Sequence, residues 1–159
     1  MFNRLLLGWL GGLLIWGYAA ISGIHCPEAA SLPSPFDSVM ADSLVNTLIC
    51  DAIAAWENGD AEQFANLFTD TGEFIVPGDR WVGQEAIRQV TADFSAEHSV
   101  KIDVHQMIVQ DQRIAIEWSW QETNRATGES SRADDVIVVT ITNGKIQRWR
   151  EYIDTQSPS

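Results

Sequence analysis

Hydrophobic residues recur with a helical period in the first part of the domain. Across residues 38–57 they return every three to four positions, which is the one-sided stripe of an amphipathic helix. Asn58-Gly59 ends this helix, and Asp60, followed by Gln63, opens a short second helix in the manner of a capping box. A third helix is predicted over residues 84–94.

After residue 94 the spacing changes to strict alternation, which is typical of β-strands. The expected strands cover residues 100–110, 113–124, 131–142 and 145–154, and a short earlier strand covers residues 73–76 before a Pro77-Gly78-Asp79 turn. Short polar or glycine turns join the last four into an antiparallel meander. In the strand at 113–124 the inner face is expected to carry Ile114, Ile116, Trp118 and Trp120. Helices followed by a curved sheet predict an α+β fold.

The first 37 residues are predicted to lie outside this domain. Residues 5–24 form an uncharged apolar run long enough for a helix to cross a membrane. Arg4 is the only Lys or Arg before Arg80, which favours a cytoplasmic N-terminus and an extracytoplasmic domain. Residues 1–24 are therefore either a signal peptide or a membrane anchor. Residues 25–37 are a proline-rich linker, residues 38–155 the domain, and residues 156–159 a tail.

An exported chain with two cysteines can form a disulfide bond. Cys26 follows the apolar run, and Cys50 lies on the less apolar side of the first predicted helix. A bridge between them would tie the leader to the domain. If Cys26 is removed with a signal peptide, Cys50 is a lone thiol.

Charge excludes one class of partner. The 159 residues include 10 Lys and Arg against 22 Asp and Glu, for a formal charge of −12. So acidic a surface repels phosphate backbones, and no nucleic-acid partner is expected. No metal or cofactor site is predicted either, because His98 and His105 have no metal-ligand spacing and His105 is expected on the outer sheet face.

Turn lengths predict the strand registers. If Thr127-Gly128 is a two-residue turn, Trp120 lies opposite Asp135 and Trp118 opposite Ile137. Both pairs then face the inside of the sheet.

The last turn leaves two registers open. A three-residue loop at 142–144 places Asp135 opposite Glu151. A two-residue turn at Asn143-Gly144 would instead place Val136 opposite Glu151 and turn Asp135 outward. The first register predicts an inward layer of Trp120, Asp135 and Glu151 above a deeper layer of Trp118, Ile137 and Trp149.

Two stretches of the domain carry a family resemblance. LFTDTGEFIVPGDRWVGQEAIRQV at 67–90 and TNGKIQRWREYID at 142–154 resemble the nuclear transport factor 2-like superfamily and, within it, the SnoaL-like proteins. The match covers roughly residues 40–155. The resemblance implies a cone in which three helices close over a strongly bent, mainly antiparallel sheet around a cavity. It implies no single activity, because the superfamily includes isomerases, cyclases, dehydratases, epoxide hydrolases and non-catalytic binders.

The catalytic residues of these relatives carry over only in part. The positions that steroid isomerases of the superfamily use are apolar here: Val76, Ala52, and Val136 or Ile137. Of the three polar positions of limonene-epoxide-type hydrolases, Glu151 remains an acid, whereas Trp118 and Trp120 replace the others. For the acid–base aspartate of SnoaL-type cyclases, the candidate is Asp135.

Asp135 and Glu151 are the candidate catalytic residues. Two carboxyls so close on an apolar face cannot both ionise comfortably, so one should hold a proton near neutral pH. Two functions remain open: non-catalytic binding of a small, largely apolar molecule, and acid–base catalysis of the cyclase, isomerase or hydrolase type. Acids that converge on a closed cavity favour the enzyme, and acids splayed into solvent favour the binder. The candidate ligand-binding residues are Trp118, Trp120, Trp149, Ile137, Trp56, Phe64, Trp81 and Arg80.

The outer sheet face is predicted to be apolar as well. Val136 and Val138 alternate along a central strand on the side away from the tryptophans. Such a face is usually covered, and dimers through it are common among the relatives that the sequence resembles. We therefore expect a homodimer, with a membrane contact through residues 5–24 if that segment is not cleaved.

Overall fold

The computed structural model describes residues 38–154, which form three helices and one six-stranded sheet. The helices are α1 (Ser38–Asn58), α2 (Ala61–Asn66) and α3 (Gln84–Glu97). The strands are β1 (Phe68–Val76), β2 (Asp79–Val82), β3 (His98–Gln110), β4 (Arg113–Asn124), β5 (Ser130–Thr142) and β6 (Lys145–Asp154). All four strands of the predicted meander are present, and β2 was not foreseen.

Several predictions concern residues beyond this range. The leader at 1–24, the linker at 25–37 and the tail at 156–159 lie outside the described residues. Within residues 38–154, no helix has the length and apolar character needed to span a membrane. Cys50 on α1 is not a free thiol. Its expected partner, Cys26, also lies outside the described residues, so that bridge stays a prediction.

Local signals at the end of α1 act as the sequence predicts. Gly59 adopts a φ of 67°, a left-handed conformation that favours glycine, and the backbone N–H of Asp60 bonds back to the carbonyl of Ala55 at 2.8 Å. The Asp60 side chain then accepts a hydrogen bond from the backbone N–H of Gln63 at 2.9 Å and caps α2. The predicted helix end and cap are both confirmed.

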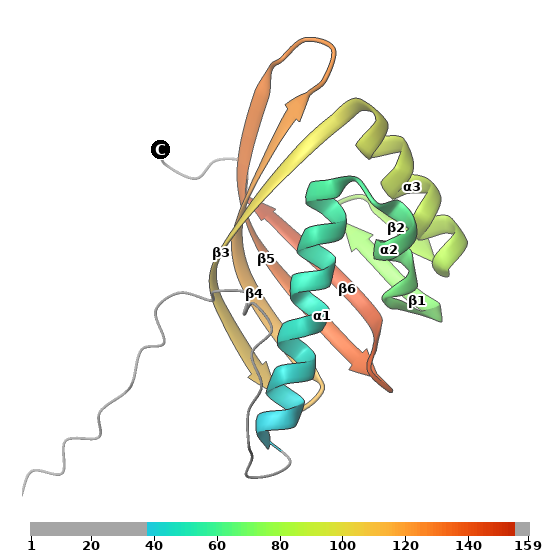
Figure 1. The fold of residues 1–159 in the computed structure, drawn as a ribbon, viewed down its shortest axis with the longest axis vertical. Coiled ribbons are helices and arrows are strands. Elements are labelled where there is room, and N and C mark those ends of the chain that lie inside the picture. The colour runs from blue at the N-terminus through green and yellow to red at the C-terminus, as the bar shows by residue number, and fades with distance from the viewer. Residues whose placement is uncertain (1–37, 155–159) are drawn as a thin grey trace, which may run out of the picture.

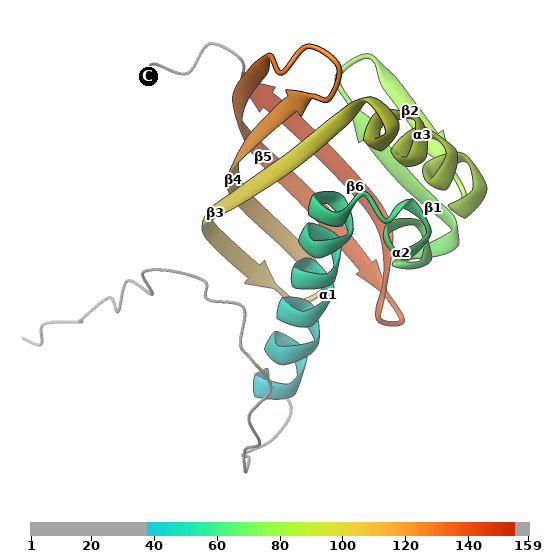
Figure 2. The ribbon, with the colours of Figure 1, turned by 45° about the horizontal axis from the view of Figure 1, so that its top comes forward.

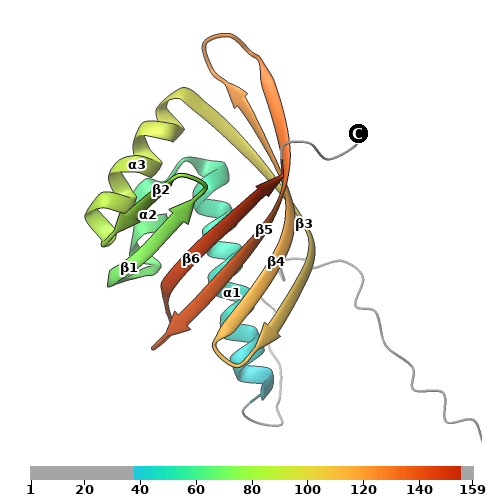
Figure 3. The ribbon, with the colours of Figure 1, turned by 180° about the vertical axis from the view of Figure 1, so that it is seen from behind.

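The sheet has the order β2-β1-β6-β5-β4-β3. All neighbouring strands are antiparallel except β1 and β6, which run parallel. The sheet curves, and the three helices lie on its concave side (Figure 1). Figure 2 shows α1 lying across this inner side, with α2 and α3 toward the β1–β2 end. Seen from behind, the other face of β3–β6 has no helix of the described chain over it (Figure 3).

The core fills the space between the helices and the concave face. Trp118, Trp149 and Ile137 are completely inaccessible to solvent, as is Phe64 from α2. The prediction that the tryptophan face of β4 points inward is confirmed. These side chains close the narrow part of the cone by direct packing, with ring centroids of Trp118 and Trp149 5.7 Å apart.

The predicted register between β4 and β5 is wrong by two residues. Trp118 lies opposite Asp135, and Trp120 lies opposite Ala133. The connection is longer than the two-residue turn expected at Thr127-Gly128, because the side chain of Asn124 accepts hydrogen bonds from the backbone N–H groups of Ala126 and Thr127, each at 3.0 Å, and widens the loop.

The register between β5 and β6 also differs from the prediction, since Ile137 rather than Asp135 lies opposite Glu151. Asn143 and Gly144 both have positive φ, 51° and 75°, and form the two-residue turn that was the alternative. That turn alone would have directed Asp135 outward. A bulge in β6, between the Thr140 and Ile141 pairings, reverses this effect and keeps Asp135 inside.

Candidate functional site

A cavity of about 480 Å³ opens at the wide end of the cone. Its walls come from α1, α3 and all strands except β3. The aromatic side chains that line it are Trp56, Phe74, Trp81, Phe94 and Trp120, and the carboxyl-bearing ones are Glu122, Asp135 and Glu151. The volume is within the range of ordinary small-molecule sites, and most of the lining is apolar.

The aromatic wall is built from distant parts of the chain that pack together. Trp56 of α1 meets Trp120 of β4 edge-on, with ring centroids 5.2 Å apart, and Phe94 of α3 at 5.8 Å. Phe74 and Trp81 stack across the β1–β2 hairpin at 5.5 Å, and Phe74 also packs against Trp56 at 6.1 Å. Mutual packing therefore holds the rings in place without a ligand.

Asp135 of β5 is one of two buried carboxyls in the cavity wall, with 3% of its surface exposed. Its Oδ2 accepts a hydrogen bond from the indole N–H of Trp118 at 3.2 Å. Its Oδ1 is buried and has no hydrogen-bond partner among the described residues. Burial raises the pKa of Asp135 from its ordinary value of 3.8 to about 6, and the neighbouring Asp134 adds to this.

Glu151 of β6 is the second buried carboxyl in the cavity wall, with 8% of its surface exposed. Its Oε1 accepts a hydrogen bond from the indole N–H of Trp149 at 2.7 Å. Burial raises its pKa from 4.5 to about 8, and repulsion by Asp135 contributes. Near pH 7 the pair thus offers a protonated Glu151 and an ionised Asp135 at one cavity, a potential proton donor beside a potential acceptor.

The structure separates the predicted site residues into three groups. Trp56, Trp81 and Trp120 line the cavity together with both candidate acids. A second group lies in the closed core, outside the cavity lining: Phe64, Trp118, Ile137 and Trp149. Two of these core residues still contact the site: Trp118 donates a hydrogen bond to Asp135, and Trp149 donates one to Glu151. Arg80 is exposed, pairs with Glu73, and also lies outside the cavity lining.

Sequence reasoning missed Phe74, Phe94 and Glu122 as cavity residues. The period-two alternation of β4 could have identified Glu122, because it falls on the same face as Trp118 and Trp120. In the structure Glu122 accepts hydrogen bonds from the indole of Trp120 at 3.4 Å and from the hydroxyl of Ser131 at 2.9 Å. It therefore contributes a third carboxyl to the cavity.

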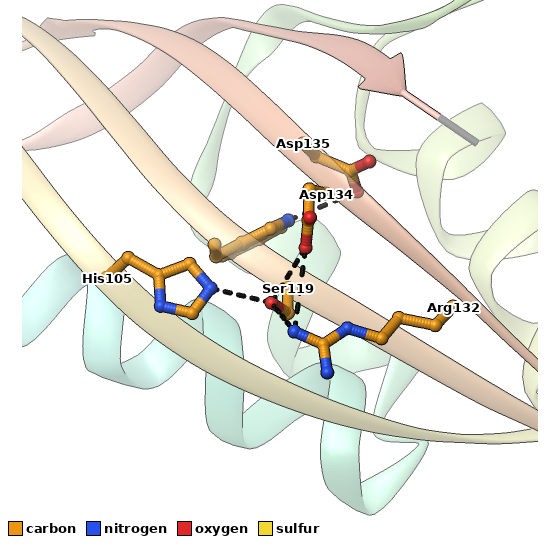
Figure 4. Close-up of polar contacts among 6 residues, drawn as sticks. His105, Ser119, Arg132, Asp134 and Asp135 are labelled. Carbon is orange, nitrogen blue, oxygen red and sulfur yellow. Dashed lines mark hydrogen bonds and ion pairs between the residues drawn. The ribbon is translucent and has the colours of Figure 1, made fainter. Parts of the chain in front are cut away.

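A polar cluster on the outer sheet face is separate from the cavity (Figure 4). The hydroxyl of Ser119 donates to Asp134 at 2.9 Å and accepts from the guanidinium of Arg132 at 2.7 Å. His105, which lies on the outer face as predicted, contacts the same hydroxyl through Nε2 at 2.6 Å. Arg132 contributes to the cavity lining, but its charged end is thus held on the other side of the sheet. Residues 38–154 contain no cluster of three His, Cys, Asp or Glu side chains that could hold a metal ion.

Helices packed against the concave side of a bent sheet, with a cavity at the wide end, define the nuclear transport factor 2-like fold. The chain belongs to the SnoaL-like domain family, whose sequence profile matches residues 50–149. Both the superfamily and the family expected from the sequence are confirmed.

Solved structures share this fold at low sequence identity. An NTF2-like protein from Burkholderia xenovorans is 22% identical, with a TM-score of 0.61 over 72% of this chain and 91% of the other. An LEH-like epoxide hydrolase from M. tuberculosis is 14% identical, with a TM-score of 0.64 over 70% and 84%. A hypothetical protein with a ketosteroid isomerase-like fold from Catenulispora acidiphila, solved in complex with trimethylamine, is 16% identical, with a TM-score of 0.64 over 69% and 87%. No curated protein shows significant sequence similarity to the chain.

Proposed function

We propose that this SnoaL-like domain binds a small, largely apolar molecule in its cavity, with Asp135 and Glu151 at the polar end. The observation that carries the proposal is a preformed cavity of about 480 Å³ whose rings already pack against one another. A rigid apolar site of this kind gains binding energy from burial of the ligand without a large ordering cost.

A neutral fluorescent probe, N-phenyl-1-naphthylamine, tests this proposal. Its emission should rise on binding to the domain. Ala133 lines the cavity opposite Trp120, so an Ala133→Phe variant should fill the space and abolish the signal. Gln121→Phe adds the same ring at an exposed position next to Trp120 and is the control. Equal signals from the two variants would overturn the proposal.

Acid–base catalysis on the bound molecule is the second candidate, and one observation favours it: both acids converge on the cavity. With pKa values of about 6 for Asp135 and about 8 for Glu151, the ionised aspartate could accept a proton while the protonated glutamate donates one. This is the state that proton transfer next to a carbonyl, or opening of an epoxide by water, requires.

Deuterium exchange of small apolar ketones and hydrolysis of small epoxides, both followed by NMR, test this activity. The rate should be highest between the two pKa values, and Asp135→Asn or Glu151→Gln should abolish it. Glu117→Gln, an exposed change on the outer face of β4, is the matched control. No turnover of either class, in protein that binds the neutral probe, would leave binding as the function.

We also propose an extracytoplasmic location, supported by the apolar run at 5–24 and the charge asymmetry around it. A fusion of the full chain to alkaline phosphatase, which is active only outside the cytoplasm, tests the location. Inactive fusion protein in intact cells would contradict it. Release of the domain without the run would identify a signal peptide, and retention with the membrane would identify an anchor.

The partner proposed for the outer face is a second copy of the chain. Val136 and Tyr152 lie opposite each other on β5 and β6 and are 45% and 51% exposed, and Val138 and Ile108 extend the same apolar surface. The described helices pack only on the other side of the sheet (Figure 3). A self-complementary contact between two such faces would bury all of these side chains.

A further inference from the structure

We propose that the ligand of this cavity is a small organic cation, an ammonium group carrying apolar substituents. This inference rests on the proposed binding function and specifies its chemistry. It is carried by an unpartnered buried oxygen, by the lack of a cationic group paired with the cavity carboxyls of the described domain, and by the aromatic rings that line the cavity.

The unpartnered oxygen is Oδ1 of Asp135. Asp135 as a residue is only 3% exposed and lines the cavity, and its other oxygen already accepts a hydrogen bond from Trp118. No described group donates to Oδ1. A buried acceptor without a donor costs about 1–3 kcal/mol, and more when it is charged. A wholly apolar ligand would leave that cost in place, whereas the N–H of an ammonium group would remove it.

No side chain of the described domain supplies the missing positive charge. Neither Asp135 nor Glu151 forms an ion pair within residues 38–154. Arg132 borders the cavity, but its guanidinium is bonded to Ser119 and paired with Asp134 on the opposite face of the sheet (Figure 4). With Glu122 near the same space, three carboxyls face the cavity without a counter-charge. Each carboxyl that is ionised attracts a cation and repels an anion, which holds for Asp135 above about pH 6 and for Glu151 above about pH 8.

The aromatic wall of the cavity suits the apolar substituents of such an ammonium ligand. The five rings that line the cavity, Trp56, Phe74, Trp81, Phe94 and Trp120, pack into one continuous aromatic cluster. Alkyl groups on nitrogen gain from burial against these rings, and the positive charge is attracted to their π-faces. Tryptophan gives the strongest attraction of this kind, and it accounts for three of the five rings.

Cation binding must be linked to pH, because the carboxyls have to ionise to pair with it. Burial raises the pKa of Asp135 to about 6 and that of Glu151 to about 8. Affinity for a permanent cation should therefore rise from pH 5 to pH 8, with release of protons from the protein. Affinity for a neutral ligand of the same shape should not rise.

Three probes of one shape and different charge test the inference: cyclohexylammonium, cyclohexanol and cyclohexanecarboxylate. Calorimetric titrations at pH 7.5, in about 150 mM salt to screen the net negative charge of the protein, measure each affinity. We expect the ammonium to bind at least about tenfold more tightly than the alcohol, and the carboxylate not to bind. At pH 5 the advantage of the ammonium should shrink.

Asp135→Asn should reduce the preference for the ammonium at pH 7.5, since it keeps an acceptor for the Trp118 indole and removes a charge that is present there. Glu151→Gln keeps an acceptor for the Trp149 indole and should reduce the preference less at pH 7.5 than at pH 9, because Glu151 ionises only near pH 8. Glu117→Gln removes an exposed charge outside the cavity and should change nothing. An alcohol that binds as tightly as the ammonium, or an equal loss in all three variants, would overturn the cationic ligand. If the neutral naphthylamine probe still binds in that case, the proposed function stands. If neither the naphthylamine nor any of the three cyclohexyl probes binds, both fail.

Discussion

Asp135 and Glu151 lie on adjacent strands, two residues out of register, and each accepts a hydrogen bond from the indole of a fully buried tryptophan. Each acid thereby uses one oxygen for the protein core. The two tryptophans hold the carboxyls against the cavity wall, where burial favours the protonated forms. The buried tryptophans of the core thus fix the position of the two carboxyls at the cavity and, with it, their protonation.

The first prediction concerns stability against pH. Both carboxyls have a higher pKa in the folded protein than in the unfolded chain, so the folded state keeps protons that the unfolded chain has lost. The free energy of unfolding should therefore fall as pH rises, through about pH 6 for Asp135 and about pH 8 for Glu151. Between pH 6 and pH 8 the Glu151 carboxyl alone should account for roughly 2 kcal/mol. Urea unfolding across this range measures the loss.

Glu151→Gln should flatten that slope, because the neutral amide can still accept from Trp149 and has no proton to lose. The variant should be more stable than the original protein at pH 9, and Glu117→Gln should retain the original slope. A Glu151→Gln variant that is strongly destabilised at every pH would show that the carboxylate is a satisfied structural acceptor.

The second prediction concerns the two tryptophans behind the acids. Trp118 and Trp149 have no exposed surface, so replacing either by Ala should cost about 3–5 kcal/mol. Trp118→Phe keeps an aromatic ring but removes the indole N–H, so it should cost less than Ala while raising the pKa of Asp135 further. Chemical denaturation checks the first effect and carboxyl NMR the second. A cost below about 1 kcal/mol for either Ala variant would contradict a packed core.

The third prediction concerns assembly. If Val136 and Val138 are covered by a second copy, residues 38–155 should sediment as a dimer at micromolar concentration. Val136→Asp should then yield a folded monomer, because a charge on each copy would be buried in the contact. Ala126→Asp, in the exposed loop after β4, is the control. A monomeric original protein would exclude this contact.

The fourth prediction tests the turn that helps to set the β5–β6 register. Gly144 has a φ of 75°, and an added Cβ would meet no atom within 4 Å. Gly144→Ala should therefore cost about 1 kcal/mol through backbone strain alone. Asn143→Gly, at a φ of 51°, should change stability by only a few tenths of a kcal/mol. Equal costs for the two variants would argue against this turn geometry.

The sequence predicted all helices, every strand except β2 and the faces of the strands, but not the registers. Both registers differ from the prediction by two residues, and a shift of two leaves each side chain on its original face. This is why Asp135 and Glu151 were correctly placed inside. The Asn124 turn is a local signal that the sequence reasoning overlooked. The bulge at Gln147, by contrast, is accompanied by long-range hydrogen bonds of Gln147 with Thr69 and Thr71 of β1, which no local pattern encodes.

The cavity was predictable only in part for a related reason. The predicted registers placed Trp118 one layer deeper than Trp120, but they did not show where the closed core ends, so both residues were expected to contact the ligand. The structure puts the first in the core and the second on the cavity wall. Phe94 reaches the wall from α3 through helix packing, which strand patterns do not report.

Carboxyl ¹³C NMR of the domain over pH 3–10 tests the central claim most directly. Asp135→Asn and Glu151→Gln, by removing one signal each, assign the two resonances. The account predicts that Glu151 titrates near pH 8 and Asp135 near pH 6, as burial at an apolar cavity requires. Midpoints near the ordinary values, about 4 for both groups, would contradict it.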